Sequence, residues 1–224
     1  SHQIPPQAIA PAAFWLAASY REFPEGTVHV AVVDPGVGTD RRILLADIDN
    51  HYFVVPDNGM LDFVCAAADR VQIRKLNRRA LYLQRISNTF HGRDIFAPAA
   101  AEIASGKVWI SELGNLTEEF ERLAITPARR SRDVITGEIL VIDHFGNLIS
   151  NVPDSLLGDD EAWTILFKDQ QIPLIKTYSA QAEGKPLALI NAFDRLEIAV
   201  RNGRAELFFD AQIGQALEIK LKST

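Results

Sequence analysis

Three short segments gather residues of the kinds that bind ligands or move protons. In the first, residues 32–41, an apolar run leads into Asp-Pro-Gly-Val-Gly-Thr-Asp-Arg, so that Asp34 and Arg41 flank a glycine-rich loop. Glycines let a backbone approach a ligand closely, and ligands of open α/β sheets bind where strands end. The loop lacks the Lys-Ser/Thr of a P-loop, and Arg41 stands where a dinucleotide fingerprint needs its third glycine. A tight turn capped by Asp34 is the alternative interpretation.

The second segment, residues 87–98, places Ser-Asn-Thr-Phe-His-Gly-Arg-Asp before a predicted helix. A helix N-terminus offers unpaired N–H groups to electron-rich ligands. His91 is therefore a candidate ligand-binding residue, and a capping or packing histidine is the alternative. The third segment, residues 142–151, brings Asp143, Phe145 and Asn147 close together. An acid suits an ammonium, a ring suits stacking and an amide suits the edge of a heterocycle, although a simple β-turn also fits.

Composition excludes several other classes of protein. The formal net charge of −6 argues against binding to a phosphate backbone, and no apolar run is long enough to span a membrane. The five histidines show no metal-ligand spacing, and there is no Gly-x-Ser-x-Gly elbow. The single cysteine, Cys65, lies in an apolar stretch and is expected to be a buried hydrophobe in a cytoplasmic protein.

The elements that must position these segments change character along the chain. The first part alternates helices and strands: helices are expected over 8–20, just after the turn at 56–59, and over 92–105, and strands over 28–33, 43–49, 52–55 and 71–76. The nearly continuous apolar run at 28–33 predicts a strand covered on both faces. Beyond the basic cluster at 129–133, short strand-like runs separated by turns predict an all-β unit, at 137–142, 163–168, 172–175, 186–190, 195–200 and 216–221.

The predicted fold class is therefore an α/β N-terminal domain over 1–128, a linker over 129–133, and a small, barrel-like all-β C-terminal domain over 134–224.

Taken in order along the chain, five stretches resemble the SAM hydroxide adenosyltransferase family, relatives of the fluorinase and chlorinase that use S-adenosyl-L-methionine (SAM). They read VVDPGVGTDRR, PDNGML, TFHGRDIFAPAAAEIA, IDHFGNLISN and LALINAFDRLEIAV. The resemblance implies a catalytic trio of Asp34, Arg41 and His91. It further implies that Thr89, Phe90 and Gly92 line the reacting centre, that Asp143 holds the methionine ammonium, and that Phe145, Asn147 and Tyr178 surround the adenine.

The same resemblance implies homotrimers with the substrate bound between subunits. Family members begin with a strand and a helix that carry a ribose-binding aspartate, and residue 1 here corresponds to a point after that segment. The chain departs from the family pattern at Ala192, Asp194 and Arg204.

The function expected from this resemblance is hydrolysis of SAM at C5′ to adenosine and L-methionine, with SAM as substrate and no metal or other cofactor. The halogenases carry tyrosine where this chain has Asp34, which favours water over halide as the nucleophile. The alternatives are a SAM-dependent halogenase and a non-catalytic module that binds SAM or adenosine.

Overall fold

A computed structural model describes residues 4–158 and 163–221, and it divides the chain into two compact units, Ser1–Leu123 and Ala124–Thr224. The boundary therefore lies before the basic cluster, and residues 129–131 of the predicted linker form a strand instead. Strand β6 (Arg129–Ser131) pairs with the start of β7 (Val134–Ile142) in an antiparallel hairpin. Its like charges are tolerated because the strand is exposed at a sheet edge, where charged side chains are common.

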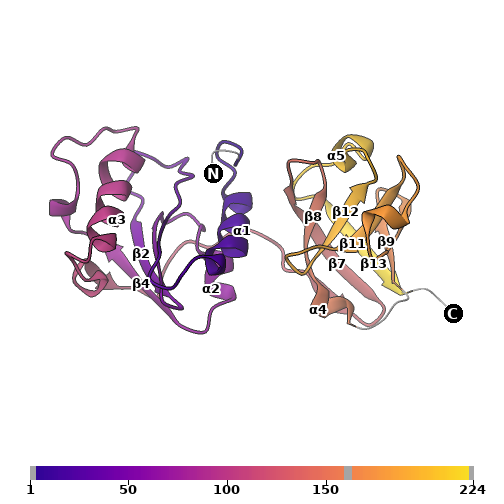
Figure 1. Cartoon of the computed structure of the whole chain (residues 1–224), viewed down its shortest axis with the longest axis horizontal. Helices are drawn as coiled ribbons and strands as arrows, with labels where there is room; N and C mark the ends of the chain where they lie inside the picture. The colour runs from indigo at the N-terminus through magenta and orange to yellow at the C-terminus, as the bar shows by residue number, and fades with distance from the viewer. Residues whose placement is uncertain (1–3, 159–162, 222–224) are drawn as a thin grey trace. The chain divides into compact units, whose positions relative to one another are not determined.

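The first unit is built on a mixed five-stranded sheet with the order β1-β3-β2-β4-β5. Figure 1 shows its strands β2 and β4 with α3 on one side and α1 and α2 on the other. Only β1 and β3 run parallel, and the other neighbours are antiparallel. The strands are β1 (Val28–Val30), β2 (Ile43–Ile48), β3 (His51–Pro56), β4 (Val71–Leu76) and β5 (Gly114–Leu116). The helices are α1 (Ile9–Ser19), α2 (Asp62–Ala66) and α3 (Ala97–Ala104), together with single 3₁₀ turns at Tyr20–Glu22, Arg79–Leu81 and Ile110–Glu112 and a π-helical turn at Gly92–Phe96.

Both faces of this sheet are covered, which explains why its central strands are apolar at nearly every position. Leu44 and Ala46 of β2 pack in one cluster with α1 and α2, whereas Ile43 and Leu45 pack in another cluster with α3. The alternation along β2 therefore sends successive side chains to different layers. The fold expected for this half, an α/β layer structure, is confirmed.

The apolar run at 28–33 differs from its prediction. Only Val28–Val30 forms a strand, and it pairs on one side alone, with β3. Val30 and Val32 remain exposed. The run is therefore apolar without being covered on both faces, because it lies at the edge of the sheet rather than in its middle. The hairpin turn between β2 and β3 also sits one residue earlier than expected, at Asp49 and Asn50, both with positive φ.

The second unit is an antiparallel sheet of eight strands that curls towards closure. Its order is β10-β9-β13-β7-β8-β12-β11, and the bridge between Leu174 and Ala188 brings the two ends together. Strand β7 bends at a register shift between Ile139 and Val141, so that its first half pairs with β13 and its second with β8. The remaining elements are β8 (Leu148–Pro153), α4 (Asp154–Leu157), β9 (Trp163–Phe167), β10 (Gln170–Pro173), a 3₁₀ turn (Tyr178–Ala180), β11 (Pro186–Ile190), β12 (Arg195–Val200), α5 (Ala205–Phe208) and β13 (Ala216–Leu221).

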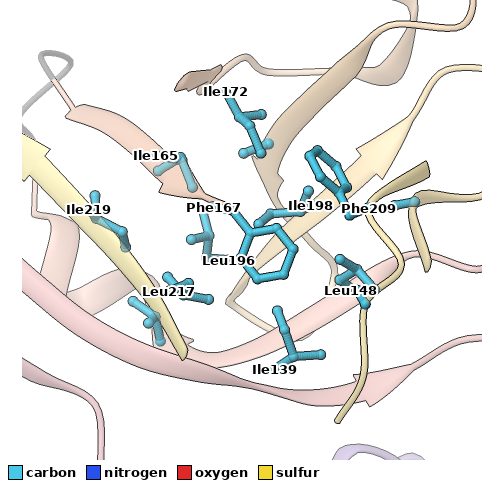
Figure 2. Close-up of a cluster of buried hydrophobic side chains, with 14 of the residues drawn as sticks. Ile139, Leu148, Ile165, Phe167, Ile172, Leu196, Ile198, Phe209, Leu217 and Ile219 are labelled. Atoms are coloured by element: carbon cyan, nitrogen blue, oxygen red, sulfur yellow. The ribbon is translucent and has the colours of Figure 1, made fainter. Parts of the chain in front are cut away.

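One continuous apolar core fills this unit. Phe167, Phe209 and Ile198 point towards one another from three different elements (Figure 2), and the two rings meet edge to face at 5.3 Å. The barrel-like all-β unit predicted from sequence is confirmed, and β11, β12 and β13 have the predicted bounds. Strand β8 was not predicted, although it includes the second half of the third polar segment, residues 148–151.

Two smaller expectations concern single features of the chain. Burial raises the pKa of the Cys65 thiol to about 11, which fits a packed, unreactive side chain. Within residues 4–158 and 163–221, no helix combines the length and hydropathy that a membrane span requires.

A histidine pair joins the edge strand β1 to its neighbour β3, with His29 in β1 and His51 at the start of β3. His29 Nε2 lies 3.2 Å from His51 Nδ1, and the His29 ring stacks on Phe53 at 4.9 Å. Tyr20 meets both imidazoles edge-on. Burial, and secondarily the neighbouring His51, lowers the pKa of His29 from 6.5 to about 4. The fold therefore holds this imidazole in its neutral form.

Acid should weaken the first unit through this pair. The unfolded chain binds a proton at His29 near pH 6.5 and the folded chain only near pH 4, so stability falls as the pH drops between these values and then levels off. We expect a loss of about 2 kcal/mol, because each pKa unit corresponds to about 1.4 kcal/mol and partial solvation reduces the total. Urea unfolding at pH 7.5 and pH 4 measures it. The His29→Gln variant should lose this component, and the exposed His144→Gln control should retain it; equal pH dependence in all three proteins would contradict the assignment.

Candidate active site

The loop after β1 folds back so that Asp34 and Arg41 form a close ion pair. Arg41 Nε donates to both carboxylate oxygens, at 2.8 and 2.7 Å, and Nη2 donates to Oδ2. The two side chains are only 5% and 10% exposed. The fold of the loop makes this possible: Val37 N–H bonds the Asp34 carbonyl and the Thr39 hydroxyl bonds the Gly36 carbonyl. The sequence interpretation of a tight turn was therefore correct in part.

His91 joins this pair from the second segment. Its Nδ1 lies 3.0 Å from Arg41 Nη2, while Phe96 places its ring under the guanidinium at 5.3 Å. Since a guanidinium only donates, Nδ1 must accept, and the imidazole is then neutral with its hydrogen on Nε2. Asp34, Arg41 and His91, which are distant along the chain, therefore meet at one place.

The helix that follows His91 begins irregularly. Residues 92–96 form a π-helical turn closed by the Ala97 N–H and the Gly92 carbonyl, and an ordinary helix continues from Ala97. Pro98 has no N–H to offer the Asp94 carbonyl, which accepts instead from the Leu83 backbone at 2.9 Å. Wide turns of this kind are frequent at functional sites. The predicted helix over 92–105 is thus confirmed, with a widened first turn.

Around His91, the other predicted residues form the rim of the same loop. Phe90 is exposed with Arg93 over its ring, Thr89 contacts Ser87, and Gly92 lies near Phe90 and Val32. Asp94 is fully buried: it accepts from Arg93 and from the Ser87 backbone, and these hydrogen bonds lower its pKa. Arg93 and Asp94 therefore anchor the loop.

A hollow opens beside the trio. It has a volume of about 630 Å³, and Asp34 forms part of its wall together with Trp15, Leu16, Val30 and Val32. Polar and apolar groups contribute about equally to its lining, and Asp34 is the member of the trio that reaches it. Asp34 therefore borders a space that a small molecule can enter.

The residues predicted in the second unit gather at a different pocket. Asp143 closes a turn, its Oδ1 accepting the N–H groups of Phe145 and Asn147 and its Oδ2 accepting the Asn147 amide. Phe145, Asn147 and Tyr178 line an open pocket of about 760 Å³, with Arg204 on the same rim. The β-turn interpretation of this segment was thus also correct, and Asp143 keeps only the acceptor positions that the turn leaves free.

Sequence reasoning missed two groups at these sites. The Phe96 ring packs against the Arg41 guanidinium, but from the sequence Phe96 is expected to be an ordinary core residue. Glu197, 3% exposed, accepts from Tyr178 and Asn191 behind the second pocket. The available signal was an acid inside the otherwise apolar run 196–200. In the described part of the chain, no three acidic, histidine or cysteine side chains are arranged to hold a metal ion.

The layered first unit, the barrel-like second unit and the partly buried Asp-Arg-His cluster define a two-domain protein with a charged site beside a hollow. Residues 1–114 match the N-terminal domain of the SAM hydroxide adenosyltransferase family, and residues 137–218 match its C-terminal domain. The chain belongs to the SAM hydroxide adenosyltransferase family.

Individual relatives agree with this placement. An "(R)-S-adenosyl-L-methionine hydrolase" of Salinispora tropica is 34% identical, with 98% of this chain and 84% of the relative covered. One of the same name from Thermus thermophilus is 32% identical, covering 92% and 80%. A fluorinase of Actinopolyspora mzabensis is more distant, at 22%. The crystal structure of an uncharacterized conserved protein from Thermotoga maritima has a TM-score of 0.89 and 30% identity, covering 98% of this chain and 87% of the other.

The loops that carry Asp34 and His91 approach each other closely at Gly38. Its φ is +82°, and a Cβ there would lie 2.5 Å from the Asn88 carbonyl oxygen. Gly38→Ala should therefore destabilise the first unit by on the order of 3 kcal/mol, through both backbone strain and a clash with backbone that cannot move away. Gly26→Ala is the matched control, since Gly26 has the same φ with nothing within 4 Å. Denaturant unfolding of both variants tests this, and equal losses would show that the loops do not depend on the contact.

Proposed function

We propose that the protein hydrolyses SAM by attack of water at C5′, releasing adenosine and L-methionine. The observation that carries the proposal is the contact of Asp34, Arg41 and His91 beside a hollow. Membership of the family and the names of the relatives support the same substrate.

The chemistry explains why such a small group of side chains suffices. The sulfonium of SAM leaves as a neutral thioether, so no acid is needed to protonate it. The difficulty is the nucleophile, because bulk water has a pKa of about 15.7. The proposed step forms the C5′–O bond, breaks the C5′–S bond and transfers one proton from water to the protein. Electrons and atoms balance without a redox partner or a metal ion.

The hydrogen bonds favour one assignment of roles within the trio. His91 Nδ1 is occupied by Arg41, and Nε2 then carries a hydrogen, so the imidazole faces a water as a donor. Asp34 Oδ1 accepts from Arg41 Nε alone and keeps a free lone pair. We therefore assign Asp34 to accept the hydrogen of the attacking water, His91 to orient the water oxygen, and Arg41 to hold both. Fixing the water in line with C5′ and sulfur lowers the entropic part of the barrier.

The remaining predicted residues bind the substrate in this proposal. Thr89, Phe90 and Gly92 line the reacting centre, and Asp143 binds the methionine ammonium through its remaining lone pairs. Phe145, Asn147 and Tyr178 surround the adenine, and their common pocket supports this grouping. Of the alternatives, halide addition is disfavoured because the Asp34 carboxylate would repel an anion. A module that only binds nucleoside would leave the buried trio without a role.

Turnover tests the proposal directly. Purified protein incubated with SAM, with and without a chelator, should release adenosine and methionine in equal amounts, followed by chromatography. Since the named relatives act on the (R) form, both sulfonium epimers should be supplied separately. Halogenated nucleoside formed in chloride or fluoride would favour the halogenase instead, and nucleoside binding without turnover would favour the binding module.

Loss of the trio should affect the rate rather than binding. Arg41→Ala and His91→Ala should lower kcat by about 10²–10⁴-fold, because they remove groups that act in the transition state. The affinity for SAM should change only a few-fold. Arg122→Ala is the matched control, since Arg122 also bonds an aspartate of the first unit but is exposed. A variant that loses binding and keeps kcat would contradict the roles assigned here.

We further propose a cytoplasmic homotrimer whose sites combine the trio of one subunit with the nucleoside pocket of a neighbour. Co-expression of the Arg41→Ala and Asn147→Ala chains tests this. Random mixing should rebuild about a quarter of the sites, because each intact site needs one unmodified half from each variant. Activity of the mixture no higher than that of the separate variants, or a monomer by light scattering, would contradict the arrangement.

A further inference from the structure

Glu197 is a buried acid in the strand behind the pocket of the second unit. It lies in β12, whose neighbours β11 and β8 place Leu189 and Ile149 beside it. The side chain is 3% exposed, and every flanking residue from Leu196 to Val200 is buried as well. A carboxylate held this far from water needs hydrogen-bond donors for both of its oxygens.

Two side chains supply those donors. The Tyr178 hydroxyl donates to Oε1 at 2.6 Å, and the Asn191 amide donates to Oε2 at 3.2 Å. The orientation of the Asn191 side-chain amide is fixed, because its Oδ1 accepts hydrogen bonds from the backbone N–H groups of Phe193 and Arg195. The Asn191 NH₂ must therefore face Glu197, and Glu197 must be the acceptor.

This network also fixes whether the Tyr178 hydroxyl can donate or accept a further hydrogen bond. A phenol has a single hydrogen to donate, and here it is committed to the carboxylate, so the oxygen can only accept further hydrogen bonds. Burial and the bond to Glu197 raise the pKa of Tyr178, so the hydroxyl keeps that hydrogen. Burial raises the pKa of Glu197, while its two hydrogen bonds favour the charged form. Tyr178 itself lines the pocket together with Phe145 and Asn147.

We propose that Glu197 is a positioning residue that determines which purines the pocket accepts, by turning Tyr178 into a hydrogen-bond acceptor. A ligand group that meets the Tyr178 oxygen must then be a donor. The 6-amino group of adenine satisfies it, whereas the 6-oxo group of hypoxanthine places two acceptors face to face. The inference rests on the proposed function, since it assumes that the pocket binds the purine of the substrate.

Nucleoside binding to the full-length protein tests the proposal. Calorimetry with adenosine and inosine should show a preference for adenosine of about 10-fold or more, because an unpaired acceptor in a pocket is costly. Tyr178→Phe should reduce the preference for adenosine over inosine to within about threefold, mainly by weakening the binding of adenosine. Glu197→Leu should reduce it similarly, because the released hydroxyl can then donate to inosine.

Further variants separate this role from a structural one. In Glu197→Gln a single carbonyl oxygen serves either Tyr178 or Asn191, so an intermediate preference is expected with the volume of the side chain kept. Glu197→Leu in the Tyr178→Phe background should cause no further change, since Glu197 acts through Tyr178. Ser179→Ala is the control, because Ser179 lines the same pocket and its hydroxyl contacts Thr177. Unfolding midpoints confirm that each protein is folded.

The outcomes distinguish this inference from the function on which it rests. Equal binding of adenosine and inosine by the unmodified protein, binding of neither, or folded Glu197 variants that keep the full preference would each overturn the inference. SAM turnover by the unmodified protein in those cases would leave the proposed function standing. A preference that shifts as expected in a protein without turnover would overturn the function and keep the inference.

Discussion

Arg41 hydrogen-bonds a carboxylate on one side and an imidazole on the other, and the geometry of the candidate site depends on these two contacts. Asp34 and Arg41 are both buried, and removal of either would leave an uncompensated charge. The same guanidinium determines which nitrogen of His91 carries the hydrogen. Phe96 supports it from below, and the backbone contact between Gly38 and Asn88 keeps the two loops in register. The reactive geometry is thus a property of the packing as well as of three side chains.

In the second unit, carboxylates are likewise held by several hydrogen bonds, but here the donors are uncharged. In the turn at Asp143 and in the network around Glu197, one carboxylate accepts from two or three donors whose directions are fixed elsewhere. Such multiply hydrogen-bonded carboxylates specify one arrangement of the surrounding chain, because each alternative would leave a donor or acceptor unpaired. The rigid wall of the pocket follows from this constraint.

Much of the fold could be predicted from local patterns, and the exceptions have physical causes. The nearly continuous apolar sequences of β2 and β11 reflect the burial of these strands. Strand β8 was missed because Ser150 and Asn151 look like turn residues. In the fold, the Ser150 hydroxyl bonds the Leu196 carbonyl, and the Asn151 side chain bonds the backbone of Glu138 and Thr126. Those partners are distant in sequence, so no local pattern could reveal them.

The site shows the same division between local and distant information. Asp34 and His91 each stood out as polar residues beside a regular element, yet their meeting depends on the sheet and on α3, and only the resemblance to a family indicated it. The prediction of a linker at 129–133 had a related weakness. The positive charges of Arg129 and Arg130 are typical of an exposed connector, but the backbone of these residues pairs with β7. Glu197 was overlooked because one acid does not change the apolar character of a strand.

The π-helical turn between His91 and Pro98 means that the direction of the imidazole is set by the number of residues there as much as by their identity. An α-helix turns by about 100° per residue, so deleting any one residue in the turn would let the helix close regularly while rotating position 91 away from the guanidinium. The helix would become more ideal and the site would be lost. Insertions and deletions, rather than substitutions, are therefore the changes that this segment tolerates least.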